Sequence, residues 1–205
     1  MNSPWRFRNK LPREFYLRGT LTVARELLGK YLVRRLNNEQ ISGIIVEAEG
    51  YLGERDPASH AYRGRTRRNE VMFWAGGHLY VYFTYGMHFC SNVVTGAEGK
   101  GHAVLIRALE PRRGVGIMRR NRRMKNEEQT QLLNGPAKIC QALQIGRGEN
   151  GTDLCGGEIW IAENPDERVP RRIARSTRVG VSKGREHRWR FFLPGNPYVS
   201  PGRPA

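Results

Sequence analysis

Residues 46–92 gather the side chains of this chain that are best suited to chemistry. The run IVEAEGYLG holds two carboxylates, Glu47 and Glu49, and then Tyr51. Residues two apart share a face of an extended strand, so all three side chains can face one cleft. His60 follows, and after it come the cation-rich RGRTRRN and the aromatic-rich HLYVYFTYGMHFCSNVV. A carboxylate, stacking rings and nearby arginines suggest a pocket for a flat ligand beside an anionic polymer.

A carboxylate beside aromatic rings could hydrolyse a glycosidic bond. Aromatic rings attract flat, electron-poor or cationic rings by about 0.5–2 kcal/mol each, and purines alkylated at a ring nitrogen carry such a charge. The carboxylate could deprotonate a water and aim it at the sugar C1′, while its charge stabilises an oxocarbenium-like transition state. A cationic base is already a good leaving group, so little general acid is needed. The residues alone leave Glu47 and Glu49 nearly equal as candidates for this base.

Tyr85 suits a second task, because it lies in an expected turn between two strands and is followed by Gly86. An enzyme that acts on a base inside a duplex must flip the base out of the stack. A side chain wedged into the vacated space offsets part of this unstacking, which costs roughly a few kcal/mol. The alternative is that Tyr80, Tyr82 and Tyr85 are strand aromatics that only cover a sheet.

Two hairpins are expected to position these side chains. The strand KYLVRRL, the turn Asn37–Asn38 and a return over residues 41–49 would form the first hairpin, which delivers the carboxylates. Strands over residues 78–83 and 88–95 would form the second hairpin, with alternate tyrosines on one face and Tyr85 in the turn.

Further strands and helices should surround the hairpins. The run AVLIRALE is apolar enough for a central strand, although Arg107 within it then needs an anionic partner. Helices are expected from Thr20, which would be the N-cap, over residues 114–124, and after Pro136. Residues 50–69 should form a loop, and the runs EIWIAE, ARSTRVGVS and RWRFFLPG should be strands and connections that close the sheet.

Length and charge limit the classes of function. At 205 residues the chain suits one well-buried core, so we expect a single domain over residues 1–205, with a basic arm at 1–10 and a tail at 201–205. The 35 Lys and Arg against 19 Asp and Glu give a net charge of +16, which favours a nucleic acid as partner. The basic residues are spread along the chain, which disfavours a membrane-surface role.

Cysteine usage and apolar runs indicate a soluble protein that works inside the cell. Cys90, Cys140 and Cys155 are far apart and form no CxxC pair, so neither a disulfide framework nor a zinc ribbon is indicated. No apolar run approaches the roughly 18 residues of a membrane span. The first residues, MNSPWRFRNKLPREF, lack the apolar core of a signal peptide.

The sequence resembles the alkyladenine (3-methyladenine) DNA glycosylase family, of the AAG/MPG type, from about Leu11 to Ser200. The resemblance rests on VARELLG, LVRRL, IVEAEGYLG, HLYVYFTYGMHFCSNV, VLIRALEP, GPAKICQAL and RVGV, in that order. It implies a monofunctional enzyme, without metal or other cofactor, that removes alkylated and deaminated purines from double-stranded DNA. It also implies a single α+β domain with a curved, largely antiparallel sheet, surrounding helices and a protruding β-hairpin. We expect a monomer in the cytoplasm or nucleoid of a bacterium, or in the nucleus of a eukaryote.

The resemblance also assigns roles position by position. It makes Glu49 the general base and leaves Glu47 to support the strand or to pair with an arginine. Arg107 would help to hold the nucleophilic water, and the main-chain carbonyl of Val179 would contact it. Tyr85 would intercalate into DNA. The base pocket would comprise Tyr51, His60 and Tyr82, which sandwich the flipped base, and Asn92, which screens out guanine through its exocyclic amine. The better candidates for phosphate contacts are Arg63, Arg65, Arg67 and Arg68.

Two departures and two competing hypotheses stay open at this point. Gly50 stands where alanine is common in the family, and His88 where an aromatic residue is common, so the preference among hypoxanthine, ethenoadenine and methylated purines is open. One alternative is a magnesium-dependent nuclease with Glu47, Glu49 and Asp56 as ligands. The other is a non-catalytic module whose aromatic side chains only stack on bases.

Overall fold

A computed structural model of the chain describes residues 9–125, 128–165 and 172–201. Most of the expected basic arm therefore lies outside the described residues, and so does the expected tail apart from Pro201. Lys10, the last residue of that arm, forms an isolated antiparallel bridge with Ala162. No helix in these three ranges is long and apolar enough to cross a lipid bilayer.

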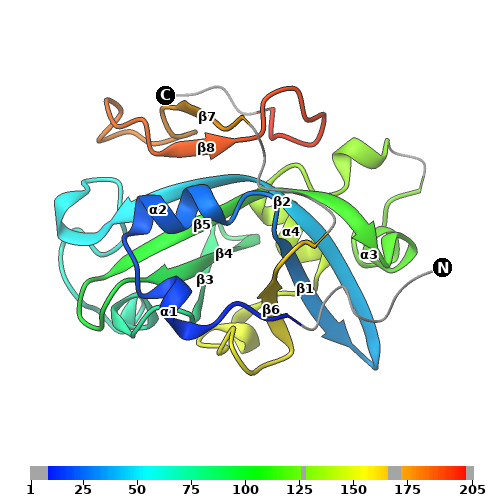
Figure 1. The fold of residues 1–205 in the computed structure, drawn as a ribbon, viewed down its shortest axis with the longest axis horizontal. Helices are drawn as coiled ribbons and strands as arrows, with labels where there is room; N and C mark the ends of the chain where they lie inside the picture. Colours follow the sequence, from blue (N-terminus) through cyan, green and yellow to red (C-terminus); the bar gives the residue numbers. More distant parts are fainter. Residues whose placement is uncertain (1–8, 126–127, 166–171, 202–205) are drawn as a thin grey trace.

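A curved, antiparallel sheet forms the centre of the molecule (Figure 1). Its main strands follow the order β3-β4-β5-β2-β1-β6, while β8 pairs with β2 and β7 pairs with β8. The strands are β1 (Tyr31–Leu36), β2 (Glu39–Leu52), β3 (Leu79–Thr84), β4 (His88–Thr95), β5 (His102–Arg113), β6 (Ile159–Ala162), β7 (Ala174–Ser176) and β8 (Arg190–Phe192). With the helices around it, this sheet confirms the expected α+β class.

The first hairpin forms where the sequence predicts it. Asn37 and Asn38 adopt φ values of 46° and 67° between β1 and β2. Asparagine tolerates this left-handed region, which a tight hairpin turn with matching twist requires. Strand β2 then runs on to Leu52, three residues beyond the expected end, because β5 pairs with it as far as that residue.

Strand β2 lies between different partners along its length. Strand β1 pairs with its first half, up to Ile44, whereas β8 pairs with residues Glu47–Glu49. The register against β5 shifts on both sides of Glu47, which marks a β-bulge. A bulge changes the direction of side chains and is common beside functional sites.

Short helices cover the sheet and bury its apolar side chains. They are α1 (Arg13–Tyr16), α2 (Thr20–Glu26), α3 (Val115–Asn121) and α4 (Pro136–Ala142), with 3-10 turns η1 (Gly53–Arg55), η2 (Glu70–Phe73), η3 (Gln129–Gln131) and η4 (Arg147–Glu149). The expected N-cap of α2 is wrong, because Gly19 takes that position and Thr20 is the first helical residue. The Thr20 hydroxyl bonds instead to the Thr95 hydroxyl at 3.0 Å, which ties α2 to β4.

One of the two following segments differs from the sequence-based expectation, and the other agrees with it. The expected loop over residues 50–69 begins only after β2 ends and contains η1. The run ARSTRVGVS forms the strand β7 over its first three residues and a connection over the rest, in agreement with the expected strands and connections. The backbone N–H of Val179 in this connection donates to a side-chain carboxylate.

Candidate active site

A cavity of about 480 Å³ opens among β2, β3, β4 and β5 and the loops that follow β2 and β7. The residues that line it come from positions up to 131 apart, from Tyr51 to Ser182. Its lining includes seven of the predicted site residues: Tyr51, His60, Tyr82, Tyr85, Asn92, Arg107 and Val179. The fold therefore brings together in one place the aromatic rings, the amide and the arginine that the sequence singled out.

The carboxylate of Glu49 lies directly behind the wall of this cavity. Its side chain is fully buried. Oε1 accepts the backbone N–H of Val179 at 2.7 Å, and Oε2 accepts the Tyr51 hydroxyl at 2.9 Å. The Arg107 guanidinium is 3.4 Å from both oxygens. All three donors line the cavity, so Glu49 lies behind this part of its wall.

Glu47 has different neighbours from Glu49. This distinguishes the two carboxylates, which the sequence alone left nearly equal as candidates for the general base. Its oxygens accept Nε of Arg107 at 2.9 Å and Nε of Arg190 at 2.7 Å. The backbone N–H and the hydroxyl of Ser200 add bonds of 2.6 Å and 2.9 Å. Two guanidinium groups thus satisfy Glu47, which confirms that it pairs with arginine and that Arg107 has an anionic partner. Glu49 is the carboxylate left beside the cavity.

Burial and the neighbouring charged and hydrogen-bonding groups set the protonation of Glu49. Burial raises the pKa of Glu49 above its usual range, while Arg107, the Val179 amide and the Tyr51 hydroxyl act in the opposite direction. Burial also raises the pKa of Tyr51, and the nearby Glu49 charge adds to that shift, so the phenol stays a hydrogen-bond donor. Burial alone would lower the pKa of Arg107, but Glu49 and Glu47 together raise it. The result is a carboxylate that is more basic than an exposed glutamate.

The aromatic wall is built by Tyr80, Tyr82 and His60. The two tyrosine rings stack with centroids 5.6 Å apart, and His60 meets Tyr82 edge-on at 4.4 Å. His60 Nδ1 lies 3.1 Å from the Tyr80 hydroxyl. Burial, with Arg68 nearby, lowers the pKa of His60, so the ring is neutral at neutral pH. A flat ligand would either stack on the outside of this group of rings or displace His60 from Tyr82 and lie between them.

Tyr80 is not among the predicted site residues, yet it forms part of the cavity wall. A usable signal was present, because Tyr80 and Tyr82 are two positions apart on a strand and share a face. Tyr80 also accepts, through its carbonyl, a 3.3 Å hydrogen bond from Nδ2 of Asn92. This bond fixes the orientation of the Asn92 amide on the cavity wall.

Tyr85 lies at the tip of the β3–β4 hairpin, in the turn where the sequence predicts it. Its side chain is 86% exposed, and its φ of 51° is followed by a φ of 66° at Gly86. Phe83 and Met87 are also exposed on this hairpin. A group of large apolar side chains in solvent is typical of a surface that meets a partner.

The four candidate phosphate contacts lie together on the exposed loop before η2. They are Arg63, Arg65, Arg67 and Arg68. Arg65 is 3.4 Å from Glu70, and Arg68 donates to the carbonyl of Phe83 at 3.3 Å, so this loop contacts the hairpin that carries Tyr85. Their contact with phosphates stays a prediction.

The carboxylates of the nuclease hypothesis do not share an open site. Asp56 is fully buried and paired with Arg178, with Oδ1 2.8 Å from Nη2. Glu47 is bound by Arg107 and Arg190, and Arg107 also contacts Glu49. Across the described ranges, no three His, Cys, Asp or Glu residues are grouped so that they could hold a metal ion.

Gly50 faces the opposite side of β2 from Glu49, toward α2. A Cβ at this position would lie 2.6 Å from Cδ2 of Leu21, so the glycine and the leucine fit each other. An alanine at position 50 would therefore require Leu21 to shift on the far side of the sheet. His88 pairs with Thr84 at the open end of the β3–β4 turn.

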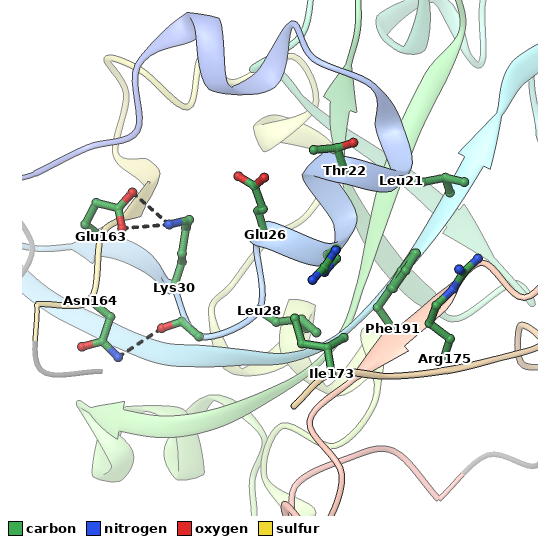
Figure 2. Close-up of a pocket in the computed structure, with 12 residues that line it drawn as sticks. Leu21, Thr22, Glu26, Leu28, Lys30, Glu163, Asn164, Ile173, Arg175 and Phe191 are labelled. Atoms are coloured by element: carbon green, nitrogen blue, oxygen red, sulfur yellow. Dashed lines mark hydrogen bonds and ion pairs between the residues drawn. The ribbon is translucent and has the colours of Figure 1, made fainter. Parts of the chain in front are cut away.

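A second cavity, of about 550 Å³, lies on this α2 side of β2 (Figure 2). Its apolar floor includes Leu21 and Phe191, and the Lys30–Glu163 ion pair at 2.8 Å forms part of its wall. None of the predicted site residues lines it. The residues that could do chemistry therefore gather in the first cavity.

Comparison with known proteins points in the same direction. Residues 14–197 match the sequence profile of a family described as methylpurine-DNA glycosylase (MPG). The chain is 52% identical over 190 residues to a protein of Carboxydothermus hydrogenoformans, covering 93% of this chain and 98% of that protein. It is 47% identical over 198 residues to one of Chlorobium phaeovibrioides, covering 96% and 99%. Both relatives are provisionally named 3-methyladenine DNA glycosylase.

Proposed function

Because this chain belongs to the methylpurine-DNA glycosylase family and is thereby a DNA-repair enzyme, we propose that it excises 3-methyladenine and other alkylated or deaminated purines from double-stranded DNA. It acts as a monomer without a metal or other cofactor. The observation that carries the proposal is the buried carboxylate of Glu49, held by three donors directly behind a cavity walled by aromatic rings.

The reaction is hydrolysis of the bond between the purine and C1′ of its deoxyribose. Glu49 takes a proton from a water as the water oxygen bonds to C1′, and the C1′–N bond breaks with its electron pair passing to the purine. A cationic alkylated purine becomes neutral when it accepts that pair, so it needs no proton to leave. The ionised carboxylate also stabilises the positive charge that develops at C1′. The products are a free base and an abasic site in an uncut strand.

The remaining cavity residues position the reactants. Arg107 and the carbonyl of Val179 hold the water, and Tyr51, His60 and Tyr82 sandwich the flipped base. Asn92 excludes guanine because its side chain occupies the place of the exocyclic amine. The lowered pKa of His60 supports this arrangement, since a neutral ring does not repel a cationic purine.

A panel of duplexes, each with one modified purine, tests the proposed function. The protein should release at least one modified base and leave an alkali-labile site, with no strand break before alkali and no effect of EDTA. Strand cleavage that depends on added magnesium would replace the proposal with a nuclease. Binding without release of any modified purine would replace it with a binding module.

The loss of activity at acid pH should report the protonation of Glu49. Only the ionised carboxylate accepts a proton from water, so kcat/KM should fall as the pH drops through its raised pKa. The fall should begin at a higher pH than for an exposed glutamate, whose pKa is about 4.3. Measurement of kcat/KM on one modified-purine duplex between about pH 4 and 8 checks this. Over roughly this range the duplex stays paired and the protein stays folded. A profile that stays flat down to about pH 4.3 contradicts it.

Replacement of Tyr85 with alanine should weaken binding to a modified-purine duplex and leave stability unchanged. Loss of a stacked aromatic costs about 1–3 kcal/mol of binding free energy, whereas an 86% exposed side chain contributes little to the fold. Fluorescence anisotropy with a labelled duplex gives the Kd. Leu17→Ala, at an exposed apolar residue next to α1, is the matched control and should bind as the wild type does. Equal affinity of Tyr85→Ala and Leu17→Ala would show that Tyr85 does not intercalate.

A further inference from the structure

Arg178 has the largest fully buried side chain in the described part of the protein. Its guanidinium makes two bonds to the carboxylate of Asp56, at 2.5 Å and 2.8 Å, and Asp56 is fully buried as well. The two residues are 122 positions apart, so this ion pair ties the loop after β2 to the connection after β7. Two parallel bonds fix the plane of the guanidinium as well as its position.

The same guanidinium holds the backbone and the ring that follow Glu49. Its central carbon lies 4.6 Å from the ring centroid of Tyr51 and 5.0 Å from that of Trp189. Nη1 donates to the carbonyl of Gly50 at 3.1 Å. The orientation of Tyr51 is therefore set by a planar cation that is itself fixed by Asp56.

The two shortest hydrogen bonds to Glu49 come from residues that Arg178 contacts or is bonded to. One donor is the Tyr51 hydroxyl at 2.9 Å, whose ring packs on the guanidinium. The other is the N–H of Val179 at 2.7 Å, which belongs to the next residue in the chain. We infer that the Asp56–Arg178 ion pair is a positioning device, which holds these two donors on the proposed general base. The inference rests on the proposed function of Glu49.

A role in stability alone does not account for this ion pair. Burying two charges costs desolvation that their attraction hardly exceeds, and replacing such a pair with packed apolar side chains is often neutral or stabilising. An apolar pair could fill the same space, but it could not fix the plane of a group that touches Tyr51 and precedes Val179. Directional bonding is the property that the site uses.

Asp56→Asn tests the inference, because the direction in which the pKa of Glu49 changes distinguishes a positioning role of the ion pair from a purely structural one. Removing a negative charge near Glu49 would by itself lower the pKa of Glu49. Loosening the Tyr51 hydroxyl and the Val179 amide would raise it, because both bonds favour the ionised form. The other groups that face Glu49 are Arg107, Glu47 and Tyr82, and the substitution leaves these unchanged. Arg178 also keeps its charge in this variant.

The amide proton of Val179 is the direct reporter, because it bonds to the titrating carboxylate. Its NMR chemical shift against pH gives the pKa of Glu49 without any need for activity. Single-turnover excision and duplex affinity are measured on the same samples. Arg178→Lys keeps a cation in place without the two-bond fork, and it serves if Asp56→Asn does not fold. Glu149→Gln is the control, because it removes the acid of a largely buried arginine pair outside the lining of the first cavity, with Arg34 at 3.0 Å.

We expect Asp56→Asn to raise the pKa of Glu49, to lower the excision rate by roughly 10- to 100-fold, and to change the duplex Kd by less than about threefold. Arg178→Lys should act in the same direction, and Glu149→Gln should leave all three values as in the wild type. A pKa of Glu49 that falls or stays constant in Asp56→Asn, or a rate loss shared with Glu149→Gln, would overturn the inference. If the wild type releases no base while the Val179 amide responds as expected, the proposed function fails and the positioning of Glu49 stands.

Discussion

Replacing Glu49 with glutamine is expected to abolish base release while a modified-purine duplex still binds. Glutamine keeps the size of the side chain, its carbonyl oxygen can accept the N–H of Val179, and its amide N–H can donate to the Tyr51 hydroxyl oxygen, but it cannot take a proton from water. Loss of a general base costs about 10²- to 10⁴-fold in rate, and the electrostatic support of C1′ is lost with it. Single-turnover excision, read as alkali-labile sites, measures the rate, and fluorescence anisotropy measures the Kd.

The control for this experiment is Glu163→Gln, on the opposite side of β2. Glu163 pairs with Lys30 at the wall of the second cavity, where no predicted site residue lies (Figure 2). This variant should excise bases at the wild-type rate. Turnover of Glu49→Gln within about tenfold of the wild type would remove Glu49 from the mechanism.

Glu47→Leu is expected to cause the largest loss of stability. Glu47 is fully buried and is the carboxylate that Arg107 and Arg190 share. Its removal leaves both guanidinium groups buried without their main anion, and breaking a buried ion pair from one side costs about 3–5 kcal/mol. Urea unfolding followed by tryptophan fluorescence gives the change in the free energy of unfolding.

A matched substitution at an exposed ion pair calibrates this value. Glu26 pairs with Arg18 at 2.7 Å, and both side chains are more than 40% exposed. Glu26→Leu should cost no more than about 1 kcal/mol, because exposed pairs contribute little. A Glu47→Leu protein as stable as Glu26→Leu would mean that the buried network adds nothing to the fold.

Local sequence signals were enough to predict the hairpins that carry the site. Asn37–Asn38 between two apolar runs predicted a tight turn, and both residues adopt the left-handed φ that such a turn needs. The alternation in LYVYFT predicted that Tyr80 and Tyr82 share a face, and their rings stack. Patterns of this kind act over a few residues, so the sequence contains them directly.

Contacts between distant segments could not be predicted in the same way. Glu47 and Glu49 share the same local pattern, and they differ because of a β-bulge and because Arg190 and Ser200 approach Glu47 from 143 and 153 positions away. The Asp56–Arg178 pair spans 122 positions, and no local signal marks it. The family resemblance supplied the roles of single residues, but the ion pairs that hold those residues emerged only with the folded chain.

The bonds from Ser200 to Glu47 have a consequence for synthesis on the ribosome. Glu47 holds Arg107 against Glu49. The set of hydrogen bonds to Glu47 is complete only when the N–H and the hydroxyl of Ser200 reach it. A nascent chain can form the first hairpin early, yet these two bonds to Glu47 cannot form until residue 200 has left the exit tunnel. A polypeptide that ends before residue 200 should therefore lack two of the hydrogen bonds that hold Glu47.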